Sequence, residues 1–587
     1  MTHAVDEARL PAPPSRILEP KLIKALREGY SLEQLRHDAL AGLTVAILAV
    51  PLSMAIAIGA GVAPDKGLVT SVVAGAIISA LGGSRFQVGG PAAAFIVIIA
   101  SIIAAHGHDG LLIATFIAGG LLIVAGLLRL GTFIKYVPGP VVLGFTSGIG
   151  ILIALSQAKD FLGLAGDMPI EFFHKIAAIW QSLGTFNPMA FVVGGATLAG
   201  IILLKAWRPR WPGLLISIVL ASFVVWALGL NVETIGSRFG GIPSSLPAPA
   251  LPALSLSKIV DVLPSAFTIA FLVGVESLLS AVAADTMAGT RHRSNMEVLA
   301  QGVANMVSPL FGGMPATGVI ARTGTNITAG ARTPVAGILH AIFVLSLMMI
   351  AAPLVGFLAL PCLAAVLVNV SWRLIDLHEL RSFLARAPWD DRLVLLSTLV
   401  LTVLVDLNVA IGVGVVLASM LFMHRMAELH GVDLGPAALY NDDDDSLAPA
   451  LPFAPLPAGV RVFMFRGPLF FGAATAIGDA LQSVDKWPKV IILRMREVPF
   501  IDMTAVAVLD DLAAVCRKND SRIIISALQR QPRIALHNSG FLRTNRVMLT
   551  RDTPVAIARA RAYVAEAGCG RRLRRAGDAQ PDIKQDH

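Results

Sequence analysis

The sequence contains few cysteines and few charged residues for its length of 587 residues. Its three cysteines lie far apart, at Cys362, Cys516 and Cys569, with no partner at metal-ligand spacing. This pattern argues against a disulfide framework and against a zinc site. Charged residues make up only 15% of the chain and hydrophobic residues 55%. That balance excludes an ordinary soluble domain and indicates a membrane protein.

Several functional motifs are also absent. The chain has no Gly-x-x-x-x-Gly-Lys-Ser/Thr loop, so an ATP-driven pump is not expected. No Ser/His/Asp set or pair of catalytic carboxylates stands outside the apolar segments, so we expect no enzyme activity. We likewise expect no resident cofactor, no metal site and no nucleic-acid partner. The first 38 residues lack an apolar core, which predicts a cytoplasmic amino terminus without a cleavable signal peptide.

What the sequence does contain is a long series of apolar segments. Fourteen candidate membrane-spanning helices follow Asp38, and Arg and Lys residues gather in the connections expected on the cytoplasmic side. The sequence therefore predicts a polytopic α-helical membrane protein whose amino terminus and last domain are cytoplasmic. The segments lie near residues 39–60, 67–82, 91–105, 111–130, 137–157, 189–206, 211–230, 260–283, 296–311, 316–328, 334–351, 353–372, 393–407 and 408–424.

Composition changes after the last apolar segment. An acidic run from Asp442 to Asp445 and a Pro-rich stretch indicate a solvated linker, and alternating strand and helix patterns then predict a small α/β domain. The last residues are rich in arginine and are expected to be disordered. The predicted parts are a cytosolic segment 1–38, a transmembrane domain 39–426 with halves 39–230 and 258–426, a linker 427–458, the α/β domain 459–567 and a basic tail 568–587.

Two short stretches look like one element written twice. Gly89-Gly90-Pro91-Ala92 opens the apolar segment 91–105, and Gly313-Met314-Pro315-Ala316 opens the segment 316–328. Both segments are too short for a comfortable span of about 20 residues. Short segments interrupted by Gly and Pro at matching places in two halves indicate a transporter site. The alternative is two ordinary membrane helices that begin at Pro, which is favoured in the first helical turn.

Two charged residues stand inside apolar segments. Buried ionisable groups in a membrane are costly and suggest function. Arg322 could contribute to anion binding, or it could be a structural residue paired with a helix carboxyl end or an acid. Glu276 could take up and release a proton during transport. It could also coordinate sodium or pair with Arg322, and the sequence leaves these alternatives open.

The motifs resemble those of the SulP anion transporters, also called solute carrier family 26, which end in a STAS domain. Within this family, Pro51-Leu52-Ser53-Met54-Ala55 departs from the Pro-Gln-x-Met-Ala-Tyr form common in sulfate permeases. It looks closer to bacterial aerobic C4-dicarboxylate transporters and, less so, to bicarbonate transporters. The resemblance rests on these residues: Ala41-Gly42-Leu43-Thr44, Val50 to Ala55, Gly82-Gly83-Ser84-Arg85, Gly89-Gly90-Pro91, Glu276 to Ala281, Gly289-Thr290, Asn295, Gln301-Gly302, Asn305, Phe311-Gly312-Gly313 and Ile320-Ala321-Arg322.

The resemblance implies two inverted seven-helix repeats, with half-helices 91–105 and 316–328 meeting head to head. Unpaired N–H groups and the partial positive charge of two helix starts would hold a small anion there. Pro51 should disrupt the first span near its centre and turn Leu52, Ser53 and Ile56 toward the site. The predicted substrate-binding residues at the helix starts are Gly90, Pro91, Ala92, Ala93, Ala316, Thr317, Gly318 and Arg322.

The expected function is secondary active transport of a small anion across a bacterial inner membrane. A proton-coupled C4-dicarboxylate carrier, of the succinate, fumarate and aspartate class, comes first, with sulfate or sodium-coupled bicarbonate transport as alternatives. The coupling ion is therefore H⁺ or Na⁺. An anion channel and a non-transporting membrane anchor for the STAS domain are the alternatives from other classes. The expected partners are the lipid bilayer, a second copy of the chain and a cytosolic protein bound to the STAS domain.

One residue of the STAS domain is a candidate regulatory site. Thr504 follows Asp502 where related STAS proteins carry a phosphorylatable hydroxyl in the pattern Asp-x-Ser/Thr-Gly. Here Ala505 replaces the glycine. Phosphorylation of Thr504 is one prediction, a plain helix cap is the alternative, and a docking or dimer role for the domain is favoured over both.

Overall fold

The fold is described from a computed structural model, which divides into two compact units, Met1–Ala418 and Ser419–His587. Each unit is described by itself. The predicted segment 1–38, linker 427–458 and basic tail 568–587 lie partly outside the described residues. The structure describes residues 18–134, 138–166, 168–169, 171–208, 211–252, 255–405, 407–428, 431–434, 456–470, 487–544 and 546–577.

The first half of the membrane unit is helical, and its helix starts carry the expected signals. Ser31 and Gln34 form a capping box at the first long helix, α2. Pro64 and Pro188 occupy first helical positions, where a missing N–H costs nothing. The helices are α1 (Lys21–Arg27), α2 (Leu32–Gly59), α3 (Pro64–Leu81), α4 (Ile96–Leu127), α5 (Gly131–Ile134), α6 (Gly139–Ser156), α7 (Ala158–Leu162), α8 (Phe172–Ser182), α9 (Pro188–Trp207) and α10 (Gly213–Ala227).

The second half repeats this organisation. Thr234 and Ser255 cap the first two of its helices, because their hydroxyls accept hydrogen bonds from backbone N–H groups three residues later. The helices are α11 (Ile235–Phe239), α12 (Leu256–Ala288), α13 (Ser294–Val307), α14 (Ile320–Thr328), α15 (Val335–Val355), α16 (Leu360–Ile375), α17 (Leu377–Arg386), α18 (Trp389–Leu404) and α19 (Leu407–Glu428).

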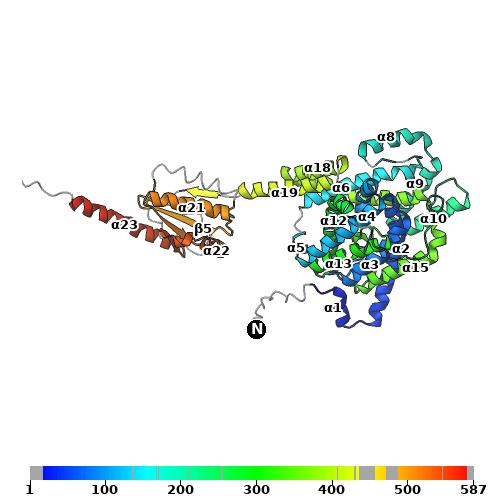
Figure 1. Ribbon diagram of the computed structural model, residues 1–587, viewed down its shortest axis with the longest axis horizontal. Helices are drawn as coiled ribbons and strands as arrows, with labels where there is room; N and C mark the ends of the chain where they lie inside the picture. Colours follow the sequence, from blue (N-terminus) through cyan, green and yellow to red (C-terminus); the bar gives the residue numbers. More distant parts are fainter. Residues whose placement is uncertain are drawn as a thin grey trace, which may run out of the picture. The chain divides into compact units, whose positions relative to one another are not determined.

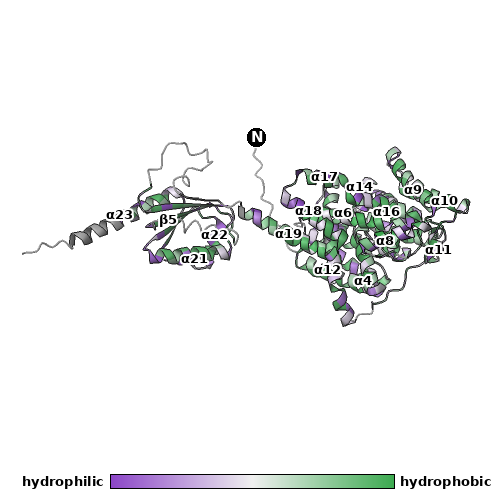
Figure 2. Ribbon diagram, turned by 90° about the horizontal axis from the view of Figure 1, so that it is seen from above, coloured by the Kyte–Doolittle hydropathy of each residue, from purple (hydrophilic) through white to green (hydrophobic). Residues whose placement is uncertain are grey.

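Every one of the fourteen predicted segments contains a described helix. Nine helices of the described residues are long and apolar enough to cross a membrane. Another expected span arises because the long helix α4 contains two predicted segments, joined at Gly107, where φ is 71°. The rest are the shorter helices α10, α13, α14 and α18. Figure 2 shows hydrophobic residues along most helices of this unit.

Contacts divide the membrane unit, whose helices Figure 1 shows, into two groups. The site group consists of α2, α3, α4, α12, α13, α14 and α15, and the flank group consists of α6, α9, α10, α16 and α18. Helices within each group pack on one another, and α16 also contacts α2 across the boundary. Close packing in the site group depends on small residues. A Cβ added at Gly119 or Gly302, for example, would collide with the facing helix.

The C-terminal unit contains a five-stranded sheet in the order β3-β4-β5-β6-β7. Its strands β4 (Val460–Arg466), β5 (Val490–Glu497), β6 (Arg522–Ser526) and β7 (Val547–Thr550) are parallel neighbours. The connecting helices are α21 (Met503–Lys518) and α22 (Arg530–Asn538), with α23 (Thr553–Gly577) at the end. Apolar side chains fill both faces of the sheet, as parallel sheets require. The predicted α/β domain thus has this architecture.

Two predicted boundaries around this unit differ from the structure. Strand β3 (Gly431–Leu434) lies inside the predicted linker and pairs antiparallel with β4, because backbone pairing can order a short segment of weak strand signal. Helix α23 runs through Gly577, into the tail that was predicted to be disordered. The helix predicted at 475–484 lies outside the described residues.

Candidate functional site

The two Gly/Pro stretches meet inside the site group. Gly89–Gly90 forms strand β1 and pairs antiparallel with Thr317–Gly318, strand β2. A 3-10 turn, η2 (Ala93–Phe95), leads from β1 into α4, and α14 follows β2. Because antiparallel strands run in opposite directions, the two helices leave the strand pair in opposite directions. Their amino ends therefore face one another, as the family resemblance implies.

The exact helix starts differ from the prediction. Gly90, Ala316, Thr317 and Gly318 lie in the extended segments before the helices and not in first helical turns. Here the strand pair occupies backbone groups that a helix would otherwise use. The first N–H groups of a helix lack intrahelical partners, and those free for a ligand follow Ala92 in the first half and Val319 in the second.

Polar side chains from neighbouring helices fix the second stretch. The Asn305 amide donates to the carbonyl of Ala316 at 2.8 Å and accepts from its N–H at 2.9 Å. The Thr70 hydroxyl accepts from the Met314 N–H at 2.8 Å. Both side chains are buried, and a buried polar group without a hydrogen-bond partner destabilises the fold. The second helix start is therefore held rigidly by α13 and α3.

Arg322 is fully buried and reaches from α14 to the other half of the protein. Its Nη2 donates to the Ser53 hydroxyl at 2.8 Å and its Nη1 to the Ser71 hydroxyl at 3.1 Å. Longer bonds of 3.4 and 3.5 Å join it to the carbonyls of Gly89 and Pro91. A Cβ at Gly90 would overlap the guanidinium, so the glycine makes room for it. Arg322 thus cross-links α2, α3 and the first helix start.

No ion pair between Arg322 and an acid is found among the described residues. All four of its partners above are uncharged, and its Nε has no hydrogen-bond partner. A positive charge without a carboxylate partner, placed beside two helix amino ends, produces a strongly positive local potential. This arrangement favours an anion in the site. It also argues against the alternative that Arg322 is only the partner of a neighbouring acid.

Helix α12 lies along the strand pair. The Thr317 hydroxyl donates to the Val273 carbonyl at 3.2 Å, and the Gln87 amide donates to the Ser277 carbonyl at 3.1 Å. Glu276 stands between these two contacts on the same helix. Its Oε2 is buried and has no hydrogen-bond partner. The carboxyl group is therefore available for a proton or a cation, and no bond joins it to Arg322.

Three predicted residues belong to α2. Ser53 is fully buried and bonds Arg322, so the structure brings it into the site. Leu52 and Ile56 are buried in the apolar core around it. Pro51 does not end the helix, because α2 continues from Leu32 to Gly59 with the proline inside. The expected break is therefore wrong, because the helix continues through Pro51. The proline still removes one backbone hydrogen-bond donor from α2.

Two predicted anion donors are engaged elsewhere in this conformation. The Ala316 N–H bonds Asn305, and the Thr317 hydroxyl bonds Val273. Ala92 is buried, while Ala93 is partly exposed at the first turn of η2. A Cβ at Gly318 would overlap the Gln87 amide, so this glycine serves packing. Among the predicted residues, two are best suited to bind an anion. Ala93 offers its backbone N–H, and Arg322 offers its positive charge.

Sequence reasoning missed several polar residues of this site. Ser71, Gln87 and Asn305 form the bonds described above, and His340 of α15 is fully buried with both ring nitrogens unpartnered. The His340 imidazole lies within electrostatic range of Arg322. Polar residues inside apolar segments were the available signal. Their partners were not predictable, because each bond joins residues of different segments that only the tertiary fold brings together.

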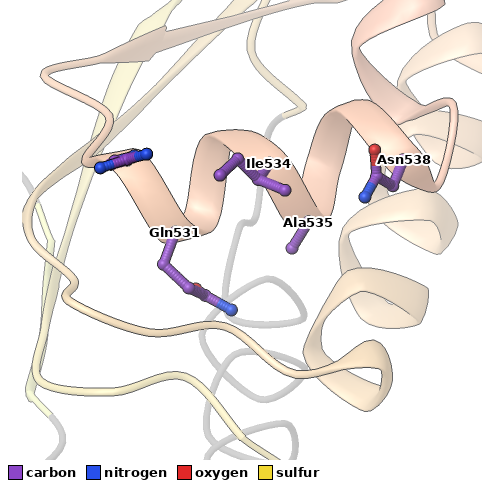
Figure 3. Close-up of a pocket in the computed structure, with 5 residues that line it drawn as sticks. Gln531, Ile534, Ala535 and Asn538 are labelled. Carbon is purple, nitrogen blue, oxygen red and sulfur yellow. The ribbon is translucent and has the colours of Figure 1, made fainter. Parts of the chain in front are cut away.

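In the C-terminal unit, Thr504 is exposed at the start of α21. The cap of this helix is Asp502, whose carboxylate accepts from the Ala505 N–H at 2.8 Å, so the alternative of Thr504 as the cap is wrong. A pocket of about 530 Å³ lies along α22, and Figure 3 shows residues that line it. One of its lining residues, Gln531, forms two hydrogen bonds with the backbone of Ile501. Thr504 and this pocket therefore adjoin the same loop.

The fold and the site define a membrane transporter class in which two helix starts and a buried arginine face one another. Residues 35–398 match the model of the sulfate permease family, and residues 454–553 match the STAS domain. The chain therefore belongs to the sulfate permease (SulP, SLC26) family. It is an anion transporter of this family and carries a C-terminal STAS domain.

Individual relatives support this assignment. The chain is 40% identical to the putative sulfate transporter YvdB of Bacillus subtilis, over 87% of this chain and 95% of that protein. It is 30% identical to the bicarbonate transporter BicA of Synechocystis, over 81% and 85% of the two chains. The structure of murine Slc26a9 in the inward-facing state matches with a TM-score of 0.81 at 19% identity, covering 95% of this chain and 96% of that one. The fold is therefore the SLC26 fold of two inverted seven-helix repeats.

Proposed function

We propose that the chain is a secondary active carrier of a small oxyanion, with sulfate as the first candidate. The observation that carries this proposal is Arg322, a buried cation with no acidic partner in the part of the chain that the structure describes. It is held where two helix starts face one another. A carrier that binds its substrate at such a site needs no ATP, because ion gradients or exchange can drive it.

The charge of the site supports a doubly charged substrate. Each helix amino end contributes about half a positive charge, so two ends and Arg322 supply about two positive charges together. Small residues, Ala92, Ala93 and Gly90, surround the first helix start and allow a compact anion to approach the backbone. Sulfate fits this charge and size. Two of the relatives above are named for sulfate or bicarbonate transport, which agrees with a small inorganic anion.

The C4-dicarboxylate preference expected from Pro51-Leu52-Ser53-Met54 finds no support in the names of these relatives. It remains a competitor, because succinate is also a dianion and Leu52 offers no polar amide to sulfate. Uptake of labelled sulfate, bicarbonate and succinate into proteoliposomes tests all three. We expect saturable sulfate uptake that the other anions inhibit less than unlabelled sulfate does. Absence of uptake for every small anion would overturn the carrier proposal.

Coupling to protons is proposed for Glu276. Its buried, unpartnered carboxyl oxygen lies one helical turn from Val273 and Ser280, which contact the second helix start. A proton on Glu276 would remove a negative charge beside an arriving anion. Sodium binding to the same carboxylate is the second candidate, since an orphaned oxygen is also a cation ligand.

The variant Glu276→Gln separates these possibilities. Gln keeps the shape of the side chain but cannot change charge, so it resembles a permanently protonated Glu. We expect anion exchange to persist while accumulation driven by an inward proton gradient is lost. If the role is sodium binding, wild-type uptake needs sodium at constant pH and the variant loses that dependence. Glu379→Gln, on the exposed surface of α17, is the matched control. Proton-driven accumulation at the wild-type level in Glu276→Gln would exclude the coupling role.

The remaining proposals concern the setting of the chain. A bacterial inner membrane, with the amino terminus and STAS domain in the cytoplasm, agrees with the bacterial relatives and with the positive residues of the cytoplasmic connections. A homodimer, a cytosolic partner of the STAS domain and phosphorylation of Thr504 stay predictions. Mass spectrometry of the native protein in lipid nanodiscs would measure both the number of chains and any phosphate on Thr504.

A further inference from the structure

Helix α8 carries an unusual surface for a connection between two membrane spans. It lies between α6 and α9, and the side chains around it form three stripes at helical spacing. One stripe, Phe172, Lys175 and Ile179, is partly buried against the protein. A second stripe is polar and exposed. A third stripe is apolar and exposed, with Phe173 exposed by 65%, Ile176 by 43% and Trp180 by 77%. The polar stripe consists of Glu171, His174 and Gln181.

We propose that the apolar stripe of α8 is buried in the interfacial layer of the lipid bilayer and anchors the flank group there. The order of the stripes supports this arrangement. The buried stripe lies between the apolar and polar ones, so a helix resting against the protein points one flank toward lipid and the other toward water. Amphipathic helices that lie in the membrane interface have this distribution, with Trp and Phe on the lipid side.

The location of α8 agrees with the membrane boundary. The Asn187 N–H bonds the carbonyl of Leu162, and the Asn187 amide bonds the carbonyl of Asn231, so the connection is tied to the ends of three neighbouring spans. Figure 1 shows α8 and the cytoplasmic helix α1 at opposite edges of this unit. The predicted spans agree with this placement. An odd number of them lies between α1 and α8, so the two helices are on opposite faces of the membrane.

The apolar stripe continues into a surface that already faces lipid. Leu183 and Phe186 follow α8 and are both exposed, and Phe186 contacts Phe191 of the spanning helix α9 at a ring-centroid distance of 6.0 Å. Phe191 and Val192 are themselves exposed on α9. The lipid-facing surface of α9 and the apolar stripe of α8 therefore form one continuous patch. This continuity with a membrane-spanning helix favours lipid over a second protein as the partner.

The anchor is connected mainly to the flank group. Helix α8 contacts α6 and α18, which belong to the flank group, and Phe172 packs on the apolar core. Burial at this protein-facing stripe also lowers the pKa of Lys175, because desolvation disfavours its charge. The anchor would hold the flank group at a fixed depth, while the site group carries the residues that bind the anion.

Nitroxide labels on the two exposed flanks test the proposal in the full chain. Trp180→Cys and Ile176→Cys report the apolar stripe, and His174→Cys and Gln181→Cys are matched controls on the polar stripe. The labels are introduced in a Cys569→Ser background, in which the remaining cysteines, Cys362 and Cys516, are buried. Accessibility to oxygen, which partitions into lipid, is compared with accessibility to a water-soluble nickel chelate in phosphatidylcholine–phosphatidylglycerol nanodiscs.

We expect the oxygen-to-nickel ratio to be several-fold higher at positions 176 and 180 than at positions 174 and 181. Equal ratios would overturn the proposal, because the stripe would then face water. Protection from both reagents, with dipolar coupling between labels, would also overturn it in favour of contact with a second copy. A second measurement avoids labels. Brominated lipid should quench the wild-type protein more than Trp180→Phe, and equal quenching would contradict the anchor.

Discussion

The two helix starts of the site have the same backbone plan but different chemistry. The first, from Gly89 to Ala94, contributes only backbone groups and small side chains. The second, from Ala316 onward, contributes Arg322 and is fixed by Asn305 and Thr70. The guanidinium of the second start bonds the carbonyls of the first. The difference teaches that the two halves share a backbone frame, whereas the charge that we propose selects an anion comes from one half alone.

Removal of Arg322 should have the largest effect on this asymmetry. Arg322→Ala takes away the one formal charge of the two helix starts, and a hydrogen bond to a charged partner is worth about 1.5–3 kcal/mol. We therefore expect anion affinity to fall by about 10- to 150-fold. Equilibrium binding of labelled sulfate to the purified protein measures the loss.

Two further variants control this experiment. Arg322→Lys should recover part of the affinity, because lysine keeps the charge but lacks the forked geometry that reaches Ser53 and Ser71 together. Arg332→Ala, at an exposed position after α14, should bind normally. Wild-type affinity in a folded Arg322→Ala variant would show that Arg322 is only structural, and the asymmetry between the helix starts would lose its functional meaning.

The sequence was sufficient to predict the parts of this site in outline, but not the contrast between its halves. Apolar length predicted the spans and two Gly/Pro breaks predicted the two short segments, since these signals are local. The meeting of the two helix starts followed only from the resemblance to the family. Arg322 and Glu276 were found because charge is rare inside apolar segments. The strand pair between Gly89–Gly90 and Thr317–Gly318 was not predictable, because two-residue strands leave no periodic signal.

The roles of individual polar groups could not be predicted either. Gln87 stands far from Ser277 in the sequence, and Asn305 lies on the helix before Ala316, 11 residues away. Only the packing of the chain brings each pair together. Thr317 was expected to offer its hydroxyl to an anion but donates it to α12. In the C-terminal unit, strand β3 was missed because its pairing with β4 supplies order that its own four residues do not signal.

A substitution at the first helix start tests whether this half contributes to anion binding only through its backbone groups and the room that its small residues leave for Arg322. Gly90→Ala adds a methyl group that would overlap the Arg322 guanidinium. We expect reduced anion affinity, smaller in extent than for Arg322→Ala, because the arginine remains but must leave Ser53 and Ser71. Sulfate binding and thermal unfolding should be measured together.

The control for this substitution is a glycine with free space. Gly120→Ala lies on α4, where an added Cβ would meet no other atom within 4 Å. It should leave binding unchanged and slightly favour the helix. Should Gly90→Ala bind sulfate like the wild type, the guanidinium must have another low-energy position, and the first helix start would not be needed to place it.

The smallest effect is expected at Thr317, the hydroxyl of the second helix start. Thr317→Val keeps the shape of the side chain and removes a neutral hydrogen bond to Val273, which is worth about 0.5–1.5 kcal/mol. This cost should appear in stability, with little change in sulfate affinity. Thr115→Val on α4 is the matched control, since its buried hydroxyl donates to the Leu111 carbonyl at 2.7 Å away from the site. If Thr317→Val lowers sulfate affinity as much as Arg322→Ala while Thr115→Val does not, the hydroxyl must turn to the anion when it binds. The second helix start would then recognise its substrate through a side-chain donor as well as through charge, and the contrast with the first start would be greater than the present conformation shows.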